Sequence, residues 1–497
     1  MSETYHNFID GKWVPARSGK TFENRNPANQ DELVGNFPDS DESDVNAAVA
    51  AARRGYESWR LVPAPRRAEI VRRAASLLEE RKEDLARLMT REMGKVLAET
   101  RGDVQEAIDC GYFASGEGRR LYGDTAPSEM PNKAAYSVRM PVGVCAMITP
   151  WNFPMAIPSW KIFPALVCGN SVVFKPATDT PASAAKFVQV LAEAGIPDGV
   201  VNFLTGGGRS VGGPLAAHPD VRVVSFTGSS EVGRVLAREC GTRLKRLSLE
   251  LGGKNAQIVM EDANLDLALE GVLWGAFGTT GQRCTATSRL ILHRPIAGVF
   301  LERLVEAARA LKVGDGLDPS TQVGPLVNEG QRETTAAYVE IGKKEGAELV
   351  CGGEPVTGTG FDRGFFYRPT VFAKVRPNMR LAREEIFGPV LSVLTVDSFE
   401  EAIHVQNDTP YGLSSSIYTQ DVNRAMRAIR DIEAGITYVN GPTIGAEVHM
   451  PFGGVKDTGN GHREASHTVL DIFTEWKTVY IDYSGKLQRA QIDNHPV

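Results

Sequence analysis

One thiol in this sequence lies where it suits chemistry better than packing. Cys284 follows Arg283 in the stretch FGTTGQRCTATSRL, between a hydroxyl-rich run and a cluster of small polar residues. Such surroundings keep a sulfur accessible, and an accessible thiolate is a strong nucleophile. The other cysteines show no C-x-x-C spacing, so neither a zinc site nor a disulfide framework is indicated; we expect inert, reduced thiols at Cys110, Cys145, Cys168, Cys240 and Cys351.

Two glycine-bearing junctions, FLTGGGRSVGGPL and SFTGSSEVGRVL, each end a β-branched run and begin a helical pattern. Such a junction directs free backbone N–H groups and the positive end of a helix at an anion. Neither junction has G-x-G-x-x-G spacing with an acidic residue about twenty positions later, so each alone is as typical of a tight turn. Their recurrence, with Lys175 at the end of another predicted strand, favours a dinucleotide site in which the lysine binds ribose hydroxyls.

The elements that must position these residues follow from the spacing of apolar side chains. From about residue 43 the N-terminal region repeats apolar residues at helical spacing, which predicts helices. Short β-branched runs then alternate with amphipathic stretches, which predicts a doubly wound parallel α/β sheet of Rossmann type with strands at VGVCAMITP, SVVFKPA, VVNFLTG and VRVVSFTG. A second α/β region runs from about GGKNAQIVM to GITYVN.

Two segments fit neither region, YGDTAPSEMPNKAAYSVRM and DIFTEWKTVYID. Both are rich in Tyr, Val and Thr, which predicts exposed β ribbon that needs a partner edge. A neighbouring subunit or another part of the same chain could supply that edge. The polar C-terminal tail is expected to order only through contact with another subunit, or not at all.

Composition narrows the class of ligand. A chain of 497 residues needs two or more lobes, and its net charge of -6 forms no basic stripe. This argues against nucleic acid or an acidic membrane surface as a partner and favours a small molecule. No run is apolar and long enough to cross a bilayer, and the N-terminus lacks a signal sequence, so we expect a cytoplasmic protein. His462 and His467 are five apart, which is not the spacing of a helical metal site, and we expect no metal.

The chain resembles the aldehyde dehydrogenase superfamily along nearly its whole length. The resemblance is carried, in the family's order, by TPWNFP, VVFKPA, FTGSSEVGR, LELGGKN, GQRC, EEIFGPV, NDTPYGLSSSIYT and PFGGVKDTG. It implies NAD(P)-dependent oxidation of an aldehyde on an aldehyde dehydrogenase-like α/β fold, and assembly into a homodimer or homotetramer. The implied parts are a dinucleotide-binding domain over 1–120 and 142–252, a catalytic domain over 253–456, an oligomerisation ribbon over 121–141 and 470–490, and a tail over 491–497.

The resemblance also implies catalytic roles. Cys284 matches the family nucleophile, which forms a thiohemiacetal and then a thioester. Asn152 matches the side-chain donor of an oxyanion hole whose second donor is the backbone N–H of Cys284. Glu250 in LELGGKN matches the general base that activates water against the thioester. Branches that pass the acyl group to coenzyme A lack this glutamate, so the resemblance favours the hydrolytic branch.

Cofactor contacts are implied in the same way. Glu385 matches the residue that holds the nicotinamide ribose, Phe387 one near the ring, and Ser229 a pyrophosphate contact. NAD-preferring members often have glutamate where this chain has Thr178, and a neutral hydroxyl does not repel a 2′-phosphate, so we expect use of both NAD and NADP. The implied cofactor residues are Ile148, Thr149, Pro150, Trp151, Lys175, Thr178, Gly228, Ser229, Glu385 and Phe387.

These motifs indicate the substrate less clearly than they indicate the cofactor. The implied substrate residues are Glu106, Phe153, Ile157, Trp160, Arg283, Thr285, Ile444 and Phe452. Trp160 and the other aromatic residues favour an apolar chain, and Trp160 and Gly278 replace the two arginines of succinate semialdehyde relatives. Glu106 and Arg283 resemble the α-aminoadipate semialdehyde branch, whereas WNFPMAIPSWKIFPAL and TGQRCTATSRL resemble ketoglutarate semialdehyde dehydrogenases.

The leading prediction is therefore an ω-semialdehyde of a keto or amino acid, such as 2-oxoglutarate semialdehyde. A broad-specificity aliphatic or aromatic aldehyde dehydrogenase is the alternative. Two further alternatives stay open, an enzyme that forms acyl-coenzyme A and a catalytically silent binding or structural protein on the same fold.

Overall fold

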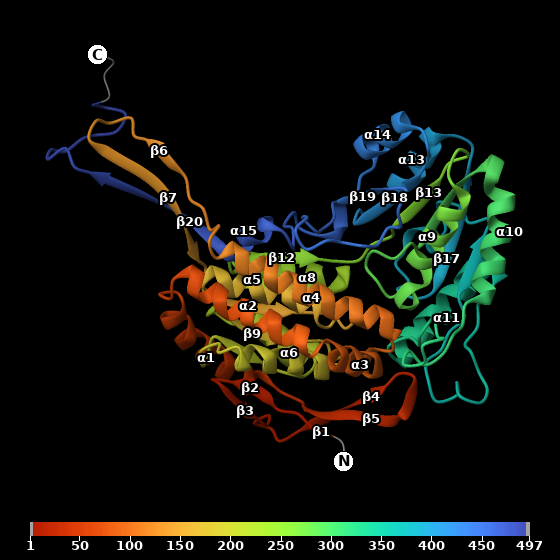
Figure 1. Cartoon of the computed structure of the whole chain (residues 1–497), viewed down its shortest axis with the longest axis horizontal. Coiled ribbons are helices and arrows are strands. Elements are labelled where there is room, and N and C mark those ends of the chain that lie inside the picture. The colour runs from red at the N-terminus through yellow and green to blue at the C-terminus, as the bar shows by residue number, and fades with distance from the viewer. Residues whose placement is uncertain (1–2, 494–497) are drawn as a thin grey trace.

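The computed structural model describes residues 3–493, so positions 494–497 of the predicted tail lie outside the described residues. These form two seven-stranded sheets, a three-stranded sheet built from N-terminal segments, and a three-stranded ribbon. Figure 1 shows the two larger sheets in neighbouring lobes, with the ribbon projecting away from the lobe that contains the N-terminal half. The predicted α/β class, with parallel sheets and a small antiparallel ribbon, is confirmed.

The first seven-stranded sheet has a parallel part of the predicted doubly wound type. Its strand order is β12 (Arg246–Glu250), β11 (Val221–Thr227), β8 (Val144–Ile148), β9 (Ser171–Lys175), β10 (Val201–Phe203), β2 (Asn7–Ile9) and β3 (Lys12–Val14). The strands from β12 to β10 are parallel, whereas β2 and β3 extend the sheet in antiparallel fashion. Every residue of β8 and β9 is buried, because helices cover both faces of a parallel sheet.

Helices of the N-terminal half pack around this sheet. They are α1 (Glu42–Trp59), α2 (Ala64–Glu80), α3 (Lys82–Met93), α4 (Leu97–Glu117), α5 (Ala156–Cys168), α6 (Pro181–Glu193), α7 (Gly213–Ala217) and α8 (Ser230–Thr242), with a π-helical turn η1 at Gly208–Gly212. All of α5 is buried between α4, α2 and the sheet. The segment before residue 43, for which the apolar spacing predicted no strand, forms β1 (Glu3–Thr4), β2, β3, β4 (Thr21–Asn26) and β5 (Asn29–Pro38).

The second seven-stranded sheet lies in the other lobe. Its order is β15 (Glu348–Cys351), β16 (Thr370–Ala373), β17 (Val390–Val396), β14 (Arg289–His293), β13 (Ala256–Val259), β18 (Ser414–Tyr418) and β19 (Ile436–Val439). All neighbours are parallel except β15, which is antiparallel to β16. Its helices are α9 (Leu265–Phe277), α10 (Arg294–Ala310), α11 (Glu329–Lys344), α12 (Arg380–Arg383), α13 (Phe399–Asn407) and α14 (Val422–Asp431).

The two predicted ribbon segments pair with each other. β20 (Thr474–Asp482) runs antiparallel to β7 (Lys133–Pro141), which also pairs with β6 (Thr125–Pro127). The short helical turns η3 (Lys456–Thr458), η4 (His467–Val469) and α15 (Leu470–Phe473) lead the chain into β20. Of the two partners considered for the ribbon, the same chain therefore supplies one edge. Within residues 3–493, no helix has the length and apolar character needed to cross a membrane.

Candidate active site

The sheet of the first lobe brings the ends of several predicted site strands together. Glu250 at the end of β12 pairs with Thr227 at the end of β11, and Ile148 at the end of β8 pairs with Lys175 at the end of β9. Carboxyl ends of parallel strands share one edge, where α/β proteins place their ligands. The loop that carries Cys284 comes from the second lobe and meets this edge.

The backbone before Cys284 is held in an uncommon conformation. Thr279 and Thr280 have φ of 53° and 57°, in the left-handed region that residues with a branched Cβ rarely adopt. The N–H of Thr279 donates to Glu99 Oε1 (2.7 Å), and Asn255 Nδ2 donates to the Cys284 carbonyl oxygen (2.7 Å). These contacts anchor the loop from both lobes and thereby fix the position of the thiol.

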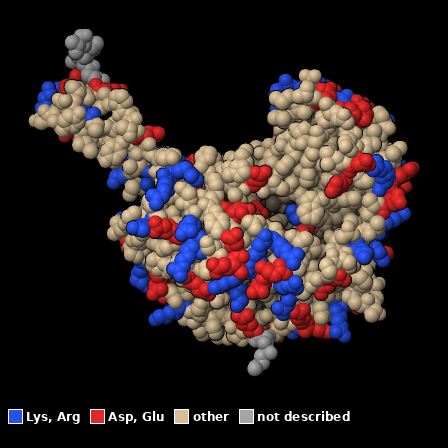
Figure 2. All heavy atoms as spheres, in the orientation of Figure 1, with Lys and Arg blue, Asp and Glu red and all other residues tan. Residues whose placement is uncertain are grey.

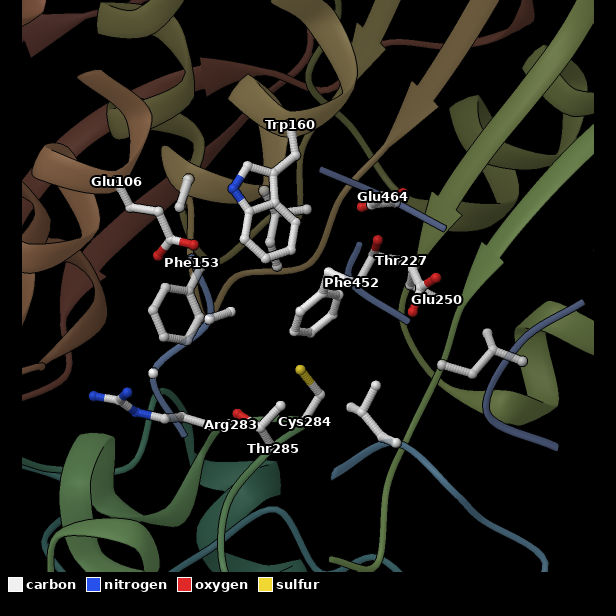
Figure 3. Close-up of a pocket in the computed structure, with 16 residues that line it drawn as sticks. Glu106, Phe153, Trp160, Thr227, Glu250, Arg283, Cys284, Thr285, Phe452 and Glu464 are labelled. Carbon is white, nitrogen blue, oxygen red and sulfur yellow. The ribbon is translucent and has the colours of Figure 1, made fainter. Parts of the chain in front are cut away.

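A cavity opens on one side of Cys284 (Figure 3). The sequence-predicted residues that line it are Glu106, Phe153, Ile157, Trp160, Glu250, Arg283, Cys284, Thr285 and Phe452. Ile444 does not line it, although the neighbouring Gly445 does. The remaining lining residues, which the sequence did not indicate, are Ala156, Thr227, Leu251, Leu413, Gly445, Ala446 and Glu464. The wall is mostly apolar, with acidic groups at separate points.

A second cavity opens on the other side of the thiol. Its lining includes Pro150, Trp151, Asn152, Gly228, Ser229, Glu385 and Phe387 from the predicted set, together with Thr227, Leu251, Gly252 and Gln331. The rings of Trp151 and Phe387 meet edge to face, with centroids 5.3 Å apart. Cys284, Thr227 and Leu251 line both cavities. The thiol therefore lies at the junction of the two.

Four predicted cofactor residues lie outside this second cavity. Ile148 and Thr149 are buried, and the N–H of Thr149 donates to the carbonyl oxygen of Lys175 (3.2 Å). Lys175 Nζ donates to the carbonyl oxygen of Pro176 (2.8 Å), while Thr178 is exposed. These four residues lie along the same edge of the sheet, on the side toward β9 and away from Cys284.

The electrostatic surroundings of Cys284 favour the neutral thiol. Burial first, and then the carboxyl groups of Glu385 and Glu250, raise the pKa of Cys284 to about 12 against the opposing effect of nearby backbone N–H groups, including that of Thr285. The thiol is half-buried, while every other cysteine is buried. Attack by this sulfur therefore requires a nearby group that accepts its proton.

Glu250 has the properties of such an acceptor. Both of its carboxyl oxygens are buried without a hydrogen-bond partner in the described part of the chain. Burial first, and then the neighbouring Glu464, raise its pKa well above the usual value, while Lys161 and Arg463 oppose this shift. Lys161 pairs with Glu464 and also donates to Ser225 Oγ (3.0 Å). Glu250 is thus an unpaired carboxyl group held beside a buried ion pair.

Glu385 occupies a fixed position in the second cavity. Its Oε1 accepts a hydrogen bond from the N–H of Gly253 (2.9 Å), and burial raises its pKa to about 7. A Cβ at Gly252 would lie 2.2 Å from Glu385 Oε2, so a larger residue there would displace the Glu385 carboxyl group. Gln331 Nε2 donates to the carbonyl oxygen of Phe387 (2.9 Å), which holds the loop after Glu385 against α11.

At the end of the first cavity away from Glu250, Arg283 and Glu106 are not paired with each other. Arg283 Nη2 lies 3.2 Å from Glu99 Oε1, and Arg283 Nε donates to Thr279 Oγ1 (2.8 Å). The guanidinium also lies over the ring of Phe153, 5.3 Å from its centroid. Glu106 lines the cavity instead of facing solvent, and it has no ion-pair or hydrogen-bond partner between residues 3 and 493.

Several residues of the site could not be identified from sequence. Glu464 belongs to 457–469, which was assigned to no domain, and Lys161 lies in an apolar helix where a lysine is atypical. Thr227 could have been found from the sequence, because it ends a predicted strand directly before the predicted Gly228. Gln331 lines the second cavity and contacts a loop distant in sequence, but it belongs to no motif. Among residues 3–493, no group of three or more His, Cys, Asp or Glu side chains could hold a metal ion.

Comparisons with known proteins agree on the family. The family model described as "Aldehyde dehydrogenase family" matches residues 13–479. The chain is 44% identical to the alpha-ketoglutarate semialdehyde dehydrogenase of Haloferax volcanii, over 97% of this chain and 100% of that protein. It is 41% identical to the alpha-ketoglutaric semialdehyde dehydrogenase of Bacillus subtilis, over 96% of this chain and 98% of that protein.

A solved structure extends the agreement to the whole fold. Betaine aldehyde dehydrogenase of Staphylococcus aureus, in complex with NAD+, superposes with a TM-score of 0.95 at 33% identity, covering 97% of this chain and 96% of that one. The matched family model and the full-length relatives lead to one conclusion. This chain belongs to the aldehyde dehydrogenase family.

Proposed function

We propose that this aldehyde dehydrogenase oxidises an ω-semialdehyde of a 2-oxo acid, with 2-oxoglutarate semialdehyde as the leading substrate, to the free carboxylic acid. The relatives from Haloferax volcanii and Bacillus subtilis that carry this substrate in their names are similar over nearly the full chain. The observation that carries the proposed chemistry is the position of Cys284, whose side chain lines both cavities. A nucleophile at this junction can hold an acyl group from one cavity while a hydride acceptor occupies the other.

NAD or NADP fits the second cavity. Ser229 precedes α8, whose N-terminus offers free N–H groups and a positive dipole end to a pyrophosphate. Glu385 presents a carboxyl group for ribose hydroxyls, and the absence of a side chain at Gly252 leaves it room. Lys175 and the exposed Thr178 would hold the adenosine end along the sheet edge. When bound, the nicotinamide supplies the hydride acceptor.

The residues around the thiol then have separate roles in the reaction. Glu250 is the base available to take the Cys284 proton, and the resulting thiolate adds to the aldehyde carbon. Asn152 lines the second cavity beside Cys284, and its amide with the backbone N–H of Cys284 would stabilise the alkoxide. Loss of hydride leaves a thioester on Cys284. Once Glu250 has released the Cys284 proton to solvent, its carboxylate removes a proton from water, which attacks the thioester and releases the acid with Cys284 as the leaving thiolate.

A broad-specificity aliphatic or aromatic aldehyde dehydrogenase is the second candidate. The observation in its favour is the apolar wall formed by Phe153, Ile157, Trp160 and Phe452 in the first cavity. Trp160 and Phe452 pack against each other with ring centroids 4.7 Å apart and so form one continuous apolar surface. The two candidates differ in whether a polar group at the end of the substrate away from the aldehyde strengthens or weakens substrate binding.

The domain division and the assembly are part of the proposal. The dinucleotide-binding parts 1–120 and 142–252 contain the first large sheet, and 253–456 contains the second. The ribbon, residues 121–141 and 470–490, is proposed to contact a second copy in a homodimer or homotetramer. In support, Trp476 and Tyr480 of β20 are 52% and 64% exposed, so the ribbon presents aromatic surface that a second copy could cover. Sedimentation velocity of the whole chain would measure the size of the assembly.

A substrate panel tests the proposed function. Production of reduced cofactor is measured with 2-oxoglutarate, succinate and α-aminoadipate semialdehydes, hexanal and benzaldehyde, with NAD and with NADP. The proposal expects the highest kcat/KM for 2-oxoglutarate semialdehyde and no rate increase from added coenzyme A. A higher kcat/KM for hexanal would favour the broad-specificity alternative, and strong dependence on coenzyme A would contradict hydrolysis.

A further inference from the structure

One hydrogen-bond donor in the wall of the first cavity has no partner. Trp160 is 5% exposed and lines this cavity, yet its indole Nε1 forms no hydrogen bond with any residue of the described chain. Buried indole N–H groups usually find an acceptor. In Figure 3 the indole nitrogen is turned toward the side of the cavity on which Glu106 lies, away from Glu250. An acceptor is therefore missing at the far end of the substrate cavity.

Glu106 supplies a second group of the same kind. It comes from α4, it lines the same cavity, and neither an ion pair nor a hydrogen bond within residues 3–493 satisfies its carboxyl group. The nearby cation Arg283 is already paired with Glu99. Because Arg283 is paired with Glu99, it attracts Glu106 less strongly. The Glu106 carboxyl group therefore stays available to a ligand.

The protonation of Glu106 decides what kind of ligand atom it would bind. Burial raises the pKa of Glu106 to about 8, with Asp103 and Asp109 of the same helix raising it and Lys95 and Arg283 lowering it. At neutral pH the group is therefore mostly a neutral acid, which can donate a hydrogen bond. A carboxylate at this place would instead attract an ammonium group.

We propose that Trp160 and Glu106 form a distal subsite that donates hydrogen bonds to oxygen atoms at the far end of the aldehyde substrate. This inference rests on the proposed function and specifies how the site recognises an oxo-acid end, with the apolar wall holding only the intervening methylene groups. An alkyl aldehyde of equal length offers no acceptor to either donor. Sites built to hydrogen-bond a substrate discriminate strongly against such analogues.

The test compares one polar and one apolar aldehyde of equal carbon number in matched variants. For 2-oxoglutarate semialdehyde the apolar partner is pentanal, and the readout is the ratio of their kcat/KM values. Trp160→Phe keeps an aromatic ring without the N–H, and we expect the ratio to fall about tenfold or more. Glu106→Leu is expected to act similarly, whereas Glu106→Gln retains an N–H donor and should stay within about threefold of wild type. A thermal unfolding midpoint close to that of wild type, measured by circular dichroism, shows that each variant is folded.

The outcomes separate this inference from the substrate assignment. If the panel identifies another polar-ended aldehyde as the best substrate, the proposed substrate is wrong, and the same ratio is measured with that aldehyde and its alkyl analogue. An unchanged ratio in both Trp160→Phe and Glu106→Leu would overturn the distal subsite. An equal fall of the ratio in Glu106→Gln and Glu106→Leu, together with a preference for the α-amino semialdehyde, would also overturn it. Glu106 would then act as a carboxylate.

Discussion

The two cavities that meet at Cys284 are built in different ways. The proposed cofactor cavity takes Trp151, Gly228 and Gly252 from loops that directly follow β8, β11 and β12. These strands are neighbours in one parallel sheet, so their register fixes the relative positions of the loops. The proposed substrate cavity is lined by helices α4 and α5 and by loops from distant parts of the chain, such as Gly445 and Glu464.

This difference separates chemistry from specificity. Groups fixed by a sheet keep their geometry when the surrounding loops change, and loops and helix faces can change without disturbing the sheet. We therefore expect substitutions at the junction of the cavities to abolish turnover, those in the sheet-built cavity to alter cofactor choice, and those in the loop-built cavity to alter the substrate. The following predictions test this order of effects.

Replacing the nucleophile should have the largest effect. Cys284→Ala is expected to lower kcat/KM by about 10⁴-fold or more, because no other group can form the thioester. Cofactor binding, measured by quenching of tryptophan fluorescence, should be nearly unchanged. Cys351→Ala is the control, since Cys351 is a buried thiol of β15 outside both cavities. Turnover by Cys284→Ala above about one per cent of wild type would contradict the assigned role.

Glu250→Gln should separate the two halves of the reaction. Water activation is lost, so steady-state turnover is expected to fall by about 10²- to 10⁴-fold. An initial burst of reduced cofactor, at most stoichiometric with protein, should persist if another acceptor, such as solvent, takes the thiol proton slowly. Rapid-mixing absorbance measures the burst, and mass spectrometry of the quenched protein should detect the acyl adduct on Cys284. Full turnover without coenzyme A would show that Glu250 is not the base.

The same contrast explains what could be predicted from sequence. Motif residues that follow strand ends, such as Asn152, Gly228 and Ser229, lie in the cofactor cavity, because the sheet fixes the position of a motif that directly follows a strand. Glu464 has no such link: it reaches Glu250 only because the chain after η3 returns to the first lobe. Trp160 was identified by type, but whether its N–H has a partner depends on the fold around it. The N-terminal strands were missed because β1 to β3 have only two or three residues each, too few for an alternating pattern, and buried and exposed positions do not alternate regularly along β5.

Changing the sheet edge at the adenosine end should alter cofactor choice without affecting chemistry. Thr178→Glu places a carboxylate where a 2′-phosphate would lie, so kcat/KM for NADP is expected to fall about tenfold or more while that for NAD changes little. Thr178 is exposed, which makes a loss of folding stability small. Thr178→Gln is the uncharged control. Wild-type preference for NAD above about a hundredfold would show that Thr178 does not permit NADP.

The smallest effect, a shift of the pH profile, tests the residue behind the base. In Glu464→Gln a negative neighbour of Glu250 is removed and Lys161 loses its partner, and both changes favour the ionised form of Glu250. Since the ionised form acts as the base, the rise of kcat with pH should move to lower pH, while kcat on the plateau falls less than in Glu250→Gln. Thermal unfolding separates this from a folding defect, because buried Lys161 is left unpaired. A profile shifted to higher pH would mean that Glu464 assists proton transfer more than it opposes ionisation, and the cavity built from loops would then contribute to the chemistry as well as to specificity.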